Sequence, residues 1–357
     1  MKAVTIQGKT ARVVLDRPVP TPRPDQLLVK VKAAALNPTD WKHIFRGMAS
    51  DGGLSGCDYA GVVVKVGDQV TKSFKEGDRV AGVAHGANAS NINDGVFAEY
   101  AVVKGDVQVH IPDSLSFESA STFPLGVSTV NQGLYQKALG LNLPTNPTAK
   151  NEYVLIYGGS SATGSLAIQF AKLSGYKVIT TCSPRNFSFV ESLGAEKAFD
   201  YNSPTCGKDI NAYTNNALQY AWDTISLEQS AKICAEALSS EPQDAKFGSI
   251  LPVKLPRDDV KETVTLMYTI FNEEFVKGGR TTPASPDDFE SAKNIFNITE
   301  KLLADSKLKP HPESVGSDGL KGVLQGMLDL KNDKVSGKKL VYRPEETPDT
   351  EASQSYE

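Results

Sequence analysis

The stretch VLIYGGSSATGSLAIQFAKLSGYKVITTCSPRN, residues 154–186, decides the fold. An apolar run stops at Gly158 and Gly159, and a second apolar run stops at Ser-Pro-Arg-Asn. Between them Leu166 and Phe170 lie one helical turn apart, which indicates a helix with an apolar stripe. A strand, a glycine turn, a helix and another strand form one unit of a parallel, doubly wound sheet.

The glycine turn has the features of a phosphate cradle. Glycines permit a tight turn and a close approach of a pyrophosphate, and the following helix offers unpaired N–H groups and the positive end of its dipole. The spacing departs from G-x-G-x-x-G: Gly159 and Gly164 remain, with the hydroxyls of Ser160, Ser161 and Thr163 in the turn. The alternative for these residues, taken without their context, is a plain β–α turn that binds no ligand. Their strand-turn-helix-strand context favours a bound nucleotide.

The end of the second strand indicates which nucleotide binds. NAD-binding domains place a carboxylate about 20 residues beyond the glycines, where it pairs with the ribose 2′-hydroxyl. Ser183, Arg185 and Asn186 occupy that place here. A carboxylate would repel a 2′-phosphate, whereas a hydroxyl and a guanidinium bind one. The sequence therefore predicts NADP(H) rather than NAD(H), with a solvated surface arginine as the alternative for Arg185.

The remaining chain divides into segments of different character. Before Ser116 it reads as β-rich, as in residues 26–36, where apolar and lysine side chains alternate. Helices broken near Pro124 and Gly126 follow, and strands then alternate with helices. A long helix is predicted over 285–308, and a helix with a final strand over 319–343. The polar residues 346–357 read as a disordered tail.

Composition excludes several classes of function. The 357 residues carry a net charge of -4, so no overall basic field favours nucleic acid. No apolar run approaches the ~20 residues of a membrane span, and the start lacks the apolar core of a signal peptide. The four cysteines are widely spaced, which favours free thiols in a reducing compartment. We therefore expect a cytoplasmic protein that binds neither membrane nor nucleic acid.

Four further motifs resemble the medium-chain dehydrogenase/reductase superfamily. They are LNPTDWK (36–42), SGCDYAGVVVKVG (55–67), EGDRVAG (76–82) and SGKKLVYR (336–343). The resemblance implies an α/β chain with a GroES-like, β-rich catalytic domain and a doubly wound Rossmann domain. The domains expected from it are a GroES-like domain over 1–123 and 310–345 and an NADP-binding Rossmann domain over 124–309, followed by the tail 346–357.

The zinc ligands of the superfamily's alcohol dehydrogenases are not in place. Asn37 stands at the first cysteine position, and Gly56-Cys57-Asp58 stands where those enzymes have Gly-His-Glu. The histidines show no ligand spacing. Cys57 with Asp58 as half of a metal site is the alternative, but we expect no metal. The zinc-free branch that this pattern resembles reduces activated C=C bonds in quinones, enones and enoyl thioesters.

A narrower resemblance is to the fungal trans-acting enoyl reductases, which serve polyketide synthases whose own reductase domain is defective. It is carried by YGGSSATG (157–164), TCSPRNF (181–187) and YTIFNEEF (268–275), although FNEEF departs from the family's F-G-E-G stretch. The resemblance assigns NADPH contacts to Thr39, Asp40, Trp41, Lys42, Ser160, Ser161, Ala162, Thr163, Ser183, Pro184, Arg185, Asn186, Tyr201, Leu251, Pro252, Val335 and Ser336. It assigns the substrate cleft to Pro124, Leu125, Gly126, Val127, Ser128, Thr129, Val130 and Asn131, and to Thr269, Ile270, Phe271, Asn272 and Glu273.

The expected reaction is NADPH-dependent, zinc-independent reduction of an enoyl or enone C=C bond, on a small or carrier-bound carbonyl substrate and with a polyketide synthase as partner. The protein's task is to align the cofactor and stabilise negative charge. Lys42 is the candidate catalytic group, with a surface lysine as its alternative, and Tyr59 reads more readily as a core tyrosine than as a donor. A stand-alone quinone or enal reductase and an inactive nucleotide-binding protein remain alternative functions.

Overall fold

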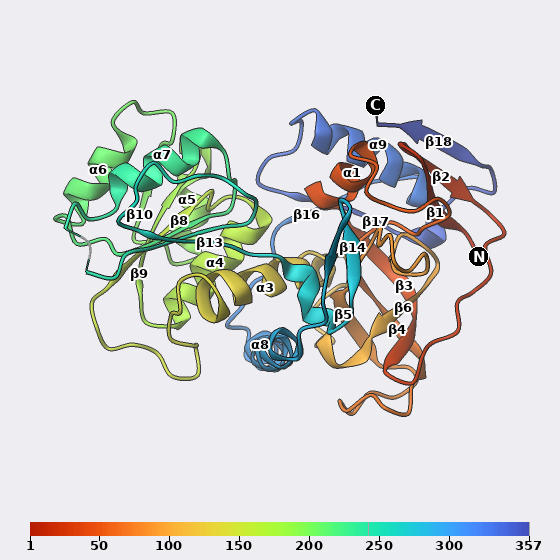
Figure 1. The fold of residues 1–357 in the computed structure, drawn as a ribbon. Helices are drawn as coiled ribbons and strands as arrows, with labels where there is room; N and C mark the ends of the chain where they lie inside the picture. The colour runs from red at the N-terminus through yellow and green to blue at the C-terminus, as the bar shows by residue number, and fades with distance from the viewer. Residues whose placement is uncertain (242, 357) are drawn as a thin grey trace. The chain divides into compact units, whose positions relative to one another are not determined.

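The computed structural model describes residues 1–241 and 243–356. The chain divides into two compact units (Figure 1). The terminal unit joins Met1–Leu125 to the chain from Tyr268 onward, and the central unit is Gly126–Met267.

The central unit is built on a parallel sheet in the order β10-β9-β8-β11-β12-β13. Its strands are β8 (Tyr153–Tyr157), β9 (Lys177–Thr181), β10 (Lys197–Phe199), β11 (Tyr220–Asp223), β12 (Lys246–Ser249) and β13 (Lys261–Val264). In chain order this is the 3-2-1-4-5-6 arrangement of a dinucleotide-binding sheet, and the winding reverses between β8 and β11. The predicted doubly wound sheet is confirmed.

The helices that connect these strands are α4 (Ala162–Leu173), α5 (Phe187–Ser192), α6 (Cys206–Tyr213) and α7 (Glu228–Ala237). Apolar residues of α6 and α7, such as Ile210 and Ala231, share a buried cluster with Leu155 and Phe247 of the strands. The predicted helix after the glycine turn ends as expected, because Gly175 has a φ of +88° and leaves the helical path.

The expected helix break near Pro124 is present between α2 (Phe117–Ala120) and Pro124, but Gly126 does not break the helix. Helix α3 (Pro124–Val130) begins at Pro124, where the missing N–H costs nothing, and runs through Gly126. A Cβ at Gly126 would lie 2.5 Å from Leu166 Cδ1 of α4, so glycine here allows close packing of the two helices. The π-helix Asn131–Gln136 follows.

The terminal unit contains a mixed sheet, β16-β17-β3-β4-β5-β7, with β6 also paired to β3; β16 is parallel to β17 and the other pairs are antiparallel. Its strands are β3 (Gln26–Ala35), β4 (Asp58–Val66), β5 (Arg79–Val83), β6 (Tyr100–Lys104), β7 (Gln108–His110), β16 (Glu313–Val315) and β17 (Lys339–Tyr342). Val29 and Val31 are buried while Lys30 is exposed, so the predicted alternation over 26–36 is confirmed. Three helices complete this part of the unit: α1 (Pro38–Phe45), α2 (Phe117–Ala120) and α9 (Gly319–Lys331).

Residues 352–356 are ordered, where the sequence predicts a disordered tail over 346–357; Glu357 lies outside the described residues. Strand β18 (Ala352–Ser355) pairs with β2 (Thr10–Val14), which pairs with β1 (Ala3–Gln7). Tyr356 is buried and its hydroxyl donates to the carbonyl of Leu324 at 2.8 Å. Backbone pairing and this one aromatic anchor hold a segment whose polar sequence predicts no strand.

Residues 268–309 belong to the terminal unit, although the sequence-based division assigns them to the Rossmann domain. The segment forms a hairpin of β14 (Phe275–Lys277) and β15 (Arg280–Thr282), then α8 (Pro286–Ala304). Glu300 of α8 accepts from Lys72 Nζ at 2.8 Å and from the His110 amide at 3.0 Å. These polar contacts fix α8 on β7.

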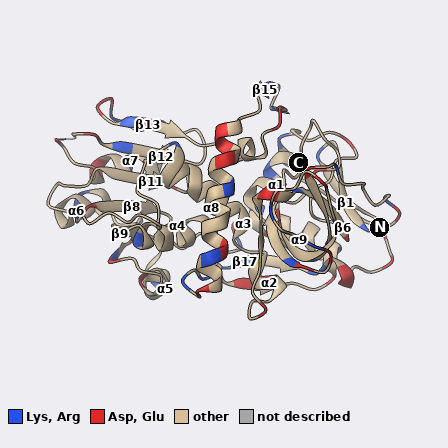
Figure 2. Ribbon diagram, turned by 90° about the horizontal axis from the view of Figure 1, so that it is seen from below, with Lys and Arg blue, Asp and Glu red and all other residues tan. Residues whose placement is uncertain are grey.

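Charges of both signs follow one another along the ribbon, as Figure 2 shows for α8. This helix has Asp287 and Asp288 in its first turn and Lys301 in its last turn, an order that complements the helix dipole. Within the described ranges, no helix has the length and apolar character needed to cross a bilayer.

Candidate functional site

The turn from β8 to α4 is shaped by three glycines whose Cβ positions are occupied by other atoms. Gly158 has a φ of +82°, and a Cβ on Gly159 would lie 2.0 Å from Thr180 Oγ1. A Cβ on Gly164 would lie 2.2 Å from the Gly158 carbonyl oxygen. Only glycine therefore allows the strand, turn and helix to approach so closely, as a pyrophosphate cradle requires.

Hydroxyl groups complete the turn. Ser161 is the N-cap of α4, and its Oγ accepts from the Gly164 amide at 2.9 Å. The same Oγ lies 3.2 Å from Thr224 Oγ1, which donates to the Tyr157 carbonyl at 2.8 Å. Thr224 follows β11, so this contact lies where the winding of the sheet reverses. A helix N-terminus at this point fits the pyrophosphate of a dinucleotide, and Ser160–Thr163 are the residues that would hold it.

The structure brings Ser183 and Tyr201 together at the adjacent strand ends. Ser183 Oγ lies 3.1 Å from the Tyr201 hydroxyl, and a short 3-10 turn, Pro184–Asn186, follows β9. Pro184 and Arg185 are exposed. The segment thus offers hydroxyls and an accessible guanidinium one strand away from the glycine turn, which fits the phosphate-bearing ribose predicted from the sequence.

Leu251 is held at the same carboxyl edge of the sheet. Ser226, which follows β11 with a φ of +62°, accepts at its Oγ from the amides of Ile250 at 3.2 Å and Leu251 at 3.1 Å. Pro252 follows and is exposed. Thr224 and Ser226 belong to no motif that marks a site, because isolated hydroxyl residues after a strand are common in loops.

Asp223 also escaped sequence reasoning. Its carboxylate accepts from the amides of Ile225 and Ser226, both at 2.9 Å, and from the Ser230 hydroxyl. Burial raises the pKa of this carboxyl, and the three donors counteract that rise. The side chain therefore fixes the turn from β11 to α7, beside the glycine turn.

In the terminal unit, helix α1 carries four predicted cofactor residues. Thr39 is half-buried, and its Oγ1 lies 2.6 Å from the Tyr268 hydroxyl. Asp40 is buried and accepts from the Asn37 amide at 2.7 Å, which closes the first turn of the helix. Trp41 and Lys42 are half-buried, with Lys42 Nζ 5.7 Å from the centroid of the Trp41 ring.

Asp40 makes stability depend on pH. Burial, with repulsion from Asp58, raises the pKa of Asp40 from 3.8 to about 7. Between these values the unfolded chain has lost a proton that the folded chain keeps, so the unfolding free energy should fall as the pH rises. Asp40→Asn keeps an acceptor for the Asn37 amide and should flatten this part of the curve. Urea unfolding from pH 4 to 8 measures it.

The exposed Asp16 gives the matched control for that experiment. Asp16→Asn should keep the wild-type pH profile. A profile for Asp40→Asn as steep as that of the wild type would contradict the assignment to Asp40.

A buried ion pair occupies the place that the sequence comparison with zinc enzymes singled out. Lys339 Nζ contacts Asp58 Oδ2, and the side chains are 3% and 0% exposed. Asp58 also accepts from Asn37 Nδ2 at 2.9 Å and from the Leu125 amide at 2.6 Å. Both carboxylate oxygens are thus engaged by the protein itself, which disfavours Asp58 as a metal ligand.

Cys57, the other half of the alternative metal site, is buried, and burial raises its thiol pKa well above the usual range. Among the described residues, no group of three or more His, Cys, Asp or Glu side chains is arranged to hold a metal ion. Tyr59 is fully buried and donates to Gln108 Oε1 at 3.0 Å, as a core tyrosine does.

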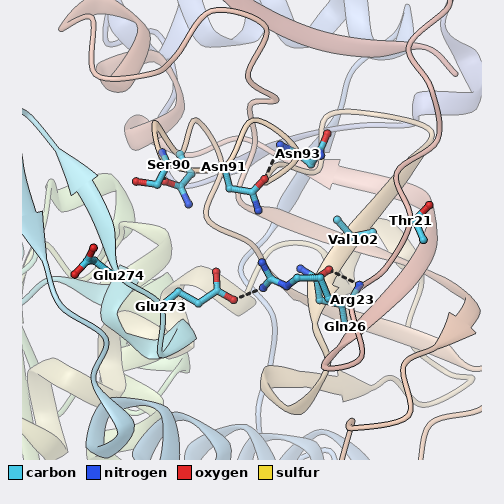
Figure 3. Close-up of a pocket in the computed structure, with 10 residues that line it drawn as sticks. Thr21, Arg23, Gln26, Ser90, Asn91, Asn93, Val102, Glu273 and Glu274 are labelled. Atoms are coloured by element: carbon cyan, nitrogen blue, oxygen red, sulfur yellow. Dashed lines mark hydrogen bonds and ion pairs between the residues drawn. The ribbon is translucent and has the colours of Figure 1, made fainter.

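The predicted substrate residues lie in different surroundings. Pro124–Asn131 form α3 and the first residue of the π-helix. Ile270 and Phe271 are buried, and Thr269 donates to Asp288. Glu273 lines a cavity of about 420 Å³ in the terminal unit, where its carboxylate points toward Arg23 and pairs with it (Figure 3). Val335 and Ser336 lie between α9 and β17.

The cavity is polar, and several of its side chains are hydrogen-bonded to other groups of the protein. The walls beside Arg23 and Glu273 are formed by Thr21, Gln26, Asn88, Ser90, Asn91, Asn93, Val102 and Glu274. Asn88 and Asn91 both donate to Asp94 at 2.8 Å, and Ser90 accepts from the Val276 amide at 2.8 Å. Hydrogen bonds of this kind are typical of a loop that is held in place by contacts within the protein.

Two family models match separate stretches of the chain. The alcohol dehydrogenase GroES-like domain matches residues 23–113, and the zinc-binding dehydrogenase domain matches residues 162–278. Among solved structures, a quinone oxidoreductase from Pseudomonas syringae is similar with a TM-score of 0.73, at 24% identity over 95% of this chain and 99% of its own. An Escherichia coli quinone oxidoreductase complexed with NADPH is similar with a TM-score of 0.71, at 18% identity over 96% and 100%. These likenesses confirm the fold.

Curated relatives are more similar in sequence. Trans-enoyl reductase ACTTS2 of Alternaria alternata is 44% identical over 96% of this chain and 98% of its own length. Trans-enoyl reductase TOXD of Cochliobolus carbonum is 48% identical over 82% and 97%. Such identity over nearly the whole length confirms the narrower resemblance and an oxidoreductase that uses a nicotinamide cofactor. The chain belongs to the trans-enoyl reductases of the medium-chain dehydrogenase/reductase superfamily.

Proposed function

We propose that the protein reduces the C=C bond of an α,β-unsaturated thioester or ketone with NADPH, in trans to a fungal polyketide synthase. The observation that carries the proposal is the 44% identity to a trans-enoyl reductase across 96% of the chain. The glycine turn at the reversal of the sheet supports the dinucleotide. The accessible guanidinium of Arg185 supports the phosphorylated form of that dinucleotide.

The residues that would hold the cofactor divide by the part of the dinucleotide they contact. The turn Ser160–Thr163 and the N-terminus of α4 would bind the pyrophosphate, while Ser183–Asn186 and Tyr201 would bind the 2′-phosphate. Thr39–Lys42, Leu251–Pro252 and Val335–Ser336 stay assigned to the dinucleotide by family resemblance. When bound, the nicotinamide supplies the hydride.

The chain's own residues must stabilise the negative charge that forms on the carbonyl oxygen. Lys42 is the proposed group. Burial, with repulsion from Arg46, lowers the pKa of Lys42, as expected for an ammonium that is partly withdrawn from water. Lys42 also lies one helical turn from Thr39, and the family resemblance assigns both residues to contacts with NADPH.

Lys42→Ala should lower kcat or weaken NADPH binding by about tenfold, the value of one charge-assisted hydrogen bond. Lys30→Ala, which removes an exposed lysine from β3 of the same unit, is the control and should leave both quantities near wild type. Steady-state kinetics and a fluorescence titration with NADPH measure the two effects. Unchanged kcat and affinity in the Lys42 variant would remove it from the site.

For the substrate, we propose that Pro124–Asn131 and Thr269–Glu273 line the acyl site. We also propose a GroES-like domain and a Rossmann domain, and we assign residues 268–309 to the GroES-like domain because they lie in the same compact unit.

The cytosol stays our prediction for the compartment in which the protein acts.

Reconstitution with a polyketide synthase tests the trans-acting role. A synthase with an inactive enoyl reductase domain should release a saturated product only when this protein and NADPH are added. Reduction of small enones or quinones at high rate, with no saturation of the synthase-bound chain, would instead identify a stand-alone reductase. No NADPH consumption with either substrate would identify an inactive binding protein.

A further inference from the structure

Tyr268 lies in a closely packed polar and aromatic cluster of the terminal unit. Its side chain is 4% exposed. The His85 ring stacks on it at 4.1 Å with an interplanar angle of 20°, and Lys277 Nζ lies 4.1 Å from its centroid. The His43 ring meets it edge-on at 5.6 Å. The phenol is therefore held in one orientation, although neither the sequence motifs nor the proposed reaction gives it a role.

The hydroxyl of Tyr268 lies 2.6 Å from Thr39 Oγ1, and it also interacts with the Cys57 thiol. Burial raises the pKa of Tyr268 well above its usual range, so the phenol keeps its hydrogen throughout the working pH. It can therefore donate to Thr39 Oγ1, although either hydroxyl of this pair can be the donor.

His43 makes the second contact to the same oxygen. Its Nδ1 lies 2.8 Å from the Thr39 carbonyl and 3.0 Å from Thr39 Oγ1. Because a carbonyl oxygen only accepts, Nδ1 must carry the hydrogen. Burial lowers the pKa of His43 to about 4, so the ring is neutral and this tautomer persists at neutral pH.

Two donors thus converge on one hydroxyl oxygen. With both lone pairs of Thr39 Oγ1 occupied, its own hydrogen is left to donate outward. Within the described residues the Tyr268 hydroxyl is the one other acceptor in contact with Thr39 Oγ1, and Thr39 is only half-buried, so when Tyr268 donates, the Thr39 hydrogen is available to a ligand. A hydroxyl arranged in this way is a preorganised donor for an acceptor oxygen of a ligand.

We infer that Tyr268 is a positioning residue, which with His43 orients the Thr39 hydroxyl as a hydrogen-bond donor to an oxygen of bound NADPH. The inference rests on the proposed function for the identity of the ligand. It adds that the cofactor contact of Thr39 depends on a tyrosine 229 residues away in the chain.

A double-mutant cycle with Tyr268→Phe and Thr39→Ala tests the inference through the NADPH dissociation constant. Each single variant should raise this constant about tenfold, the effect of one lost hydrogen bond. The double variant should bind no more weakly than Thr39→Ala alone, because Tyr268 acts through Thr39. The inference would be overturned if the fold-changes of the two single variants multiplied in the double variant. A Tyr268→Phe variant that binds NADPH like the wild type would also overturn it.

Tyr59→Phe is the matched control, since it also removes one buried tyrosine hydroxyl from the terminal unit but contacts Gln108 instead. It should keep the wild-type affinity for NADPH even if its unfolding midpoint falls. If the wild-type protein binds no NADPH, the proposed function is wrong and the inference falls with it. Wild-type binding with unchanged binding by Tyr268→Phe refutes the inference alone.

Discussion

Arg185→Glu is expected to weaken NADPH binding about 100-fold and NADH binding less than threefold. The substitution removes charge-assisted hydrogen bonds worth ~1.5–3 kcal/mol and adds repulsion between a carboxylate and the 2′-phosphate. NADH has no phosphate at that oxygen, so the substitution removes no such hydrogen bonds from bound NADH and adds no such repulsion. Titrations with both cofactors, on the same preparation, measure the ratio.

Lys197→Glu is the matched control for this charge reversal. Lys197 is exposed in the same unit, but it begins β10, at the amino end of the sheet rather than at the carboxyl end where Ser183–Asn186 lie. It should leave both affinities near wild type. Equal loss of NADPH and NADH in the Arg185 variant would refute the 2′-phosphate assignment.

Lys339→Met is expected to destabilise the protein by ~3–5 kcal/mol. Removing one member of a buried ion pair leaves the other charge uncompensated, and this costs far more than the pair itself contributes. The remaining charge here is Asp58, which is fully buried and has no other cation bonded to it among the described residues. Urea unfolding followed by circular dichroism gives the free energy.

A control variant and a double variant test whether that loss of stability comes from the ion pair. Lys338→Met removes an exposed lysine next in the chain and should change the stability by less than ~0.5 kcal/mol. Asp58→Asn combined with Lys339→Met should lose less than the sum of the single effects, because neither charge is then left alone. Additive losses, or a Lys339→Met variant as stable as wild type, would show that the pair does not stabilise the fold.

The central sheet could be predicted because its signal is local. The apolar runs, the glycines at 158, 159 and 164, and the stripe through Leu166 and Phe170 all lie within one strand-helix-strand unit. The order of the strands follows from the handedness of such units. The hydroxyl of Ser183 and the guanidinium of Arg185 could be predicted in the same way, because their segment directly follows the next strand along the chain.

The contacts that escaped prediction join distant parts of the chain. Asp58 and Lys339 are 281 residues apart, and each reads as an ordinary charge in its own motif. The sequence-based division groups helix α8 with the central strands, whereas contacts of Glu300 with Lys72 and His110 join this helix to the terminal unit. Strand β18 has no apolar alternation and depends on backbone pairing with β2.

Transfer of deuterium from NADPH that carries deuterium at both C4 positions tests the central claim most directly. The full-length protein, an α,β-unsaturated thioester and this cofactor are incubated, and the reduced product is analysed by mass spectrometry and NMR. We predict one deuterium at the β-carbon and a solvent-derived hydrogen at the α-carbon. A reduced product without deuterium, or no oxidation of NADPH with any unsaturated thioester or ketone, would contradict the account.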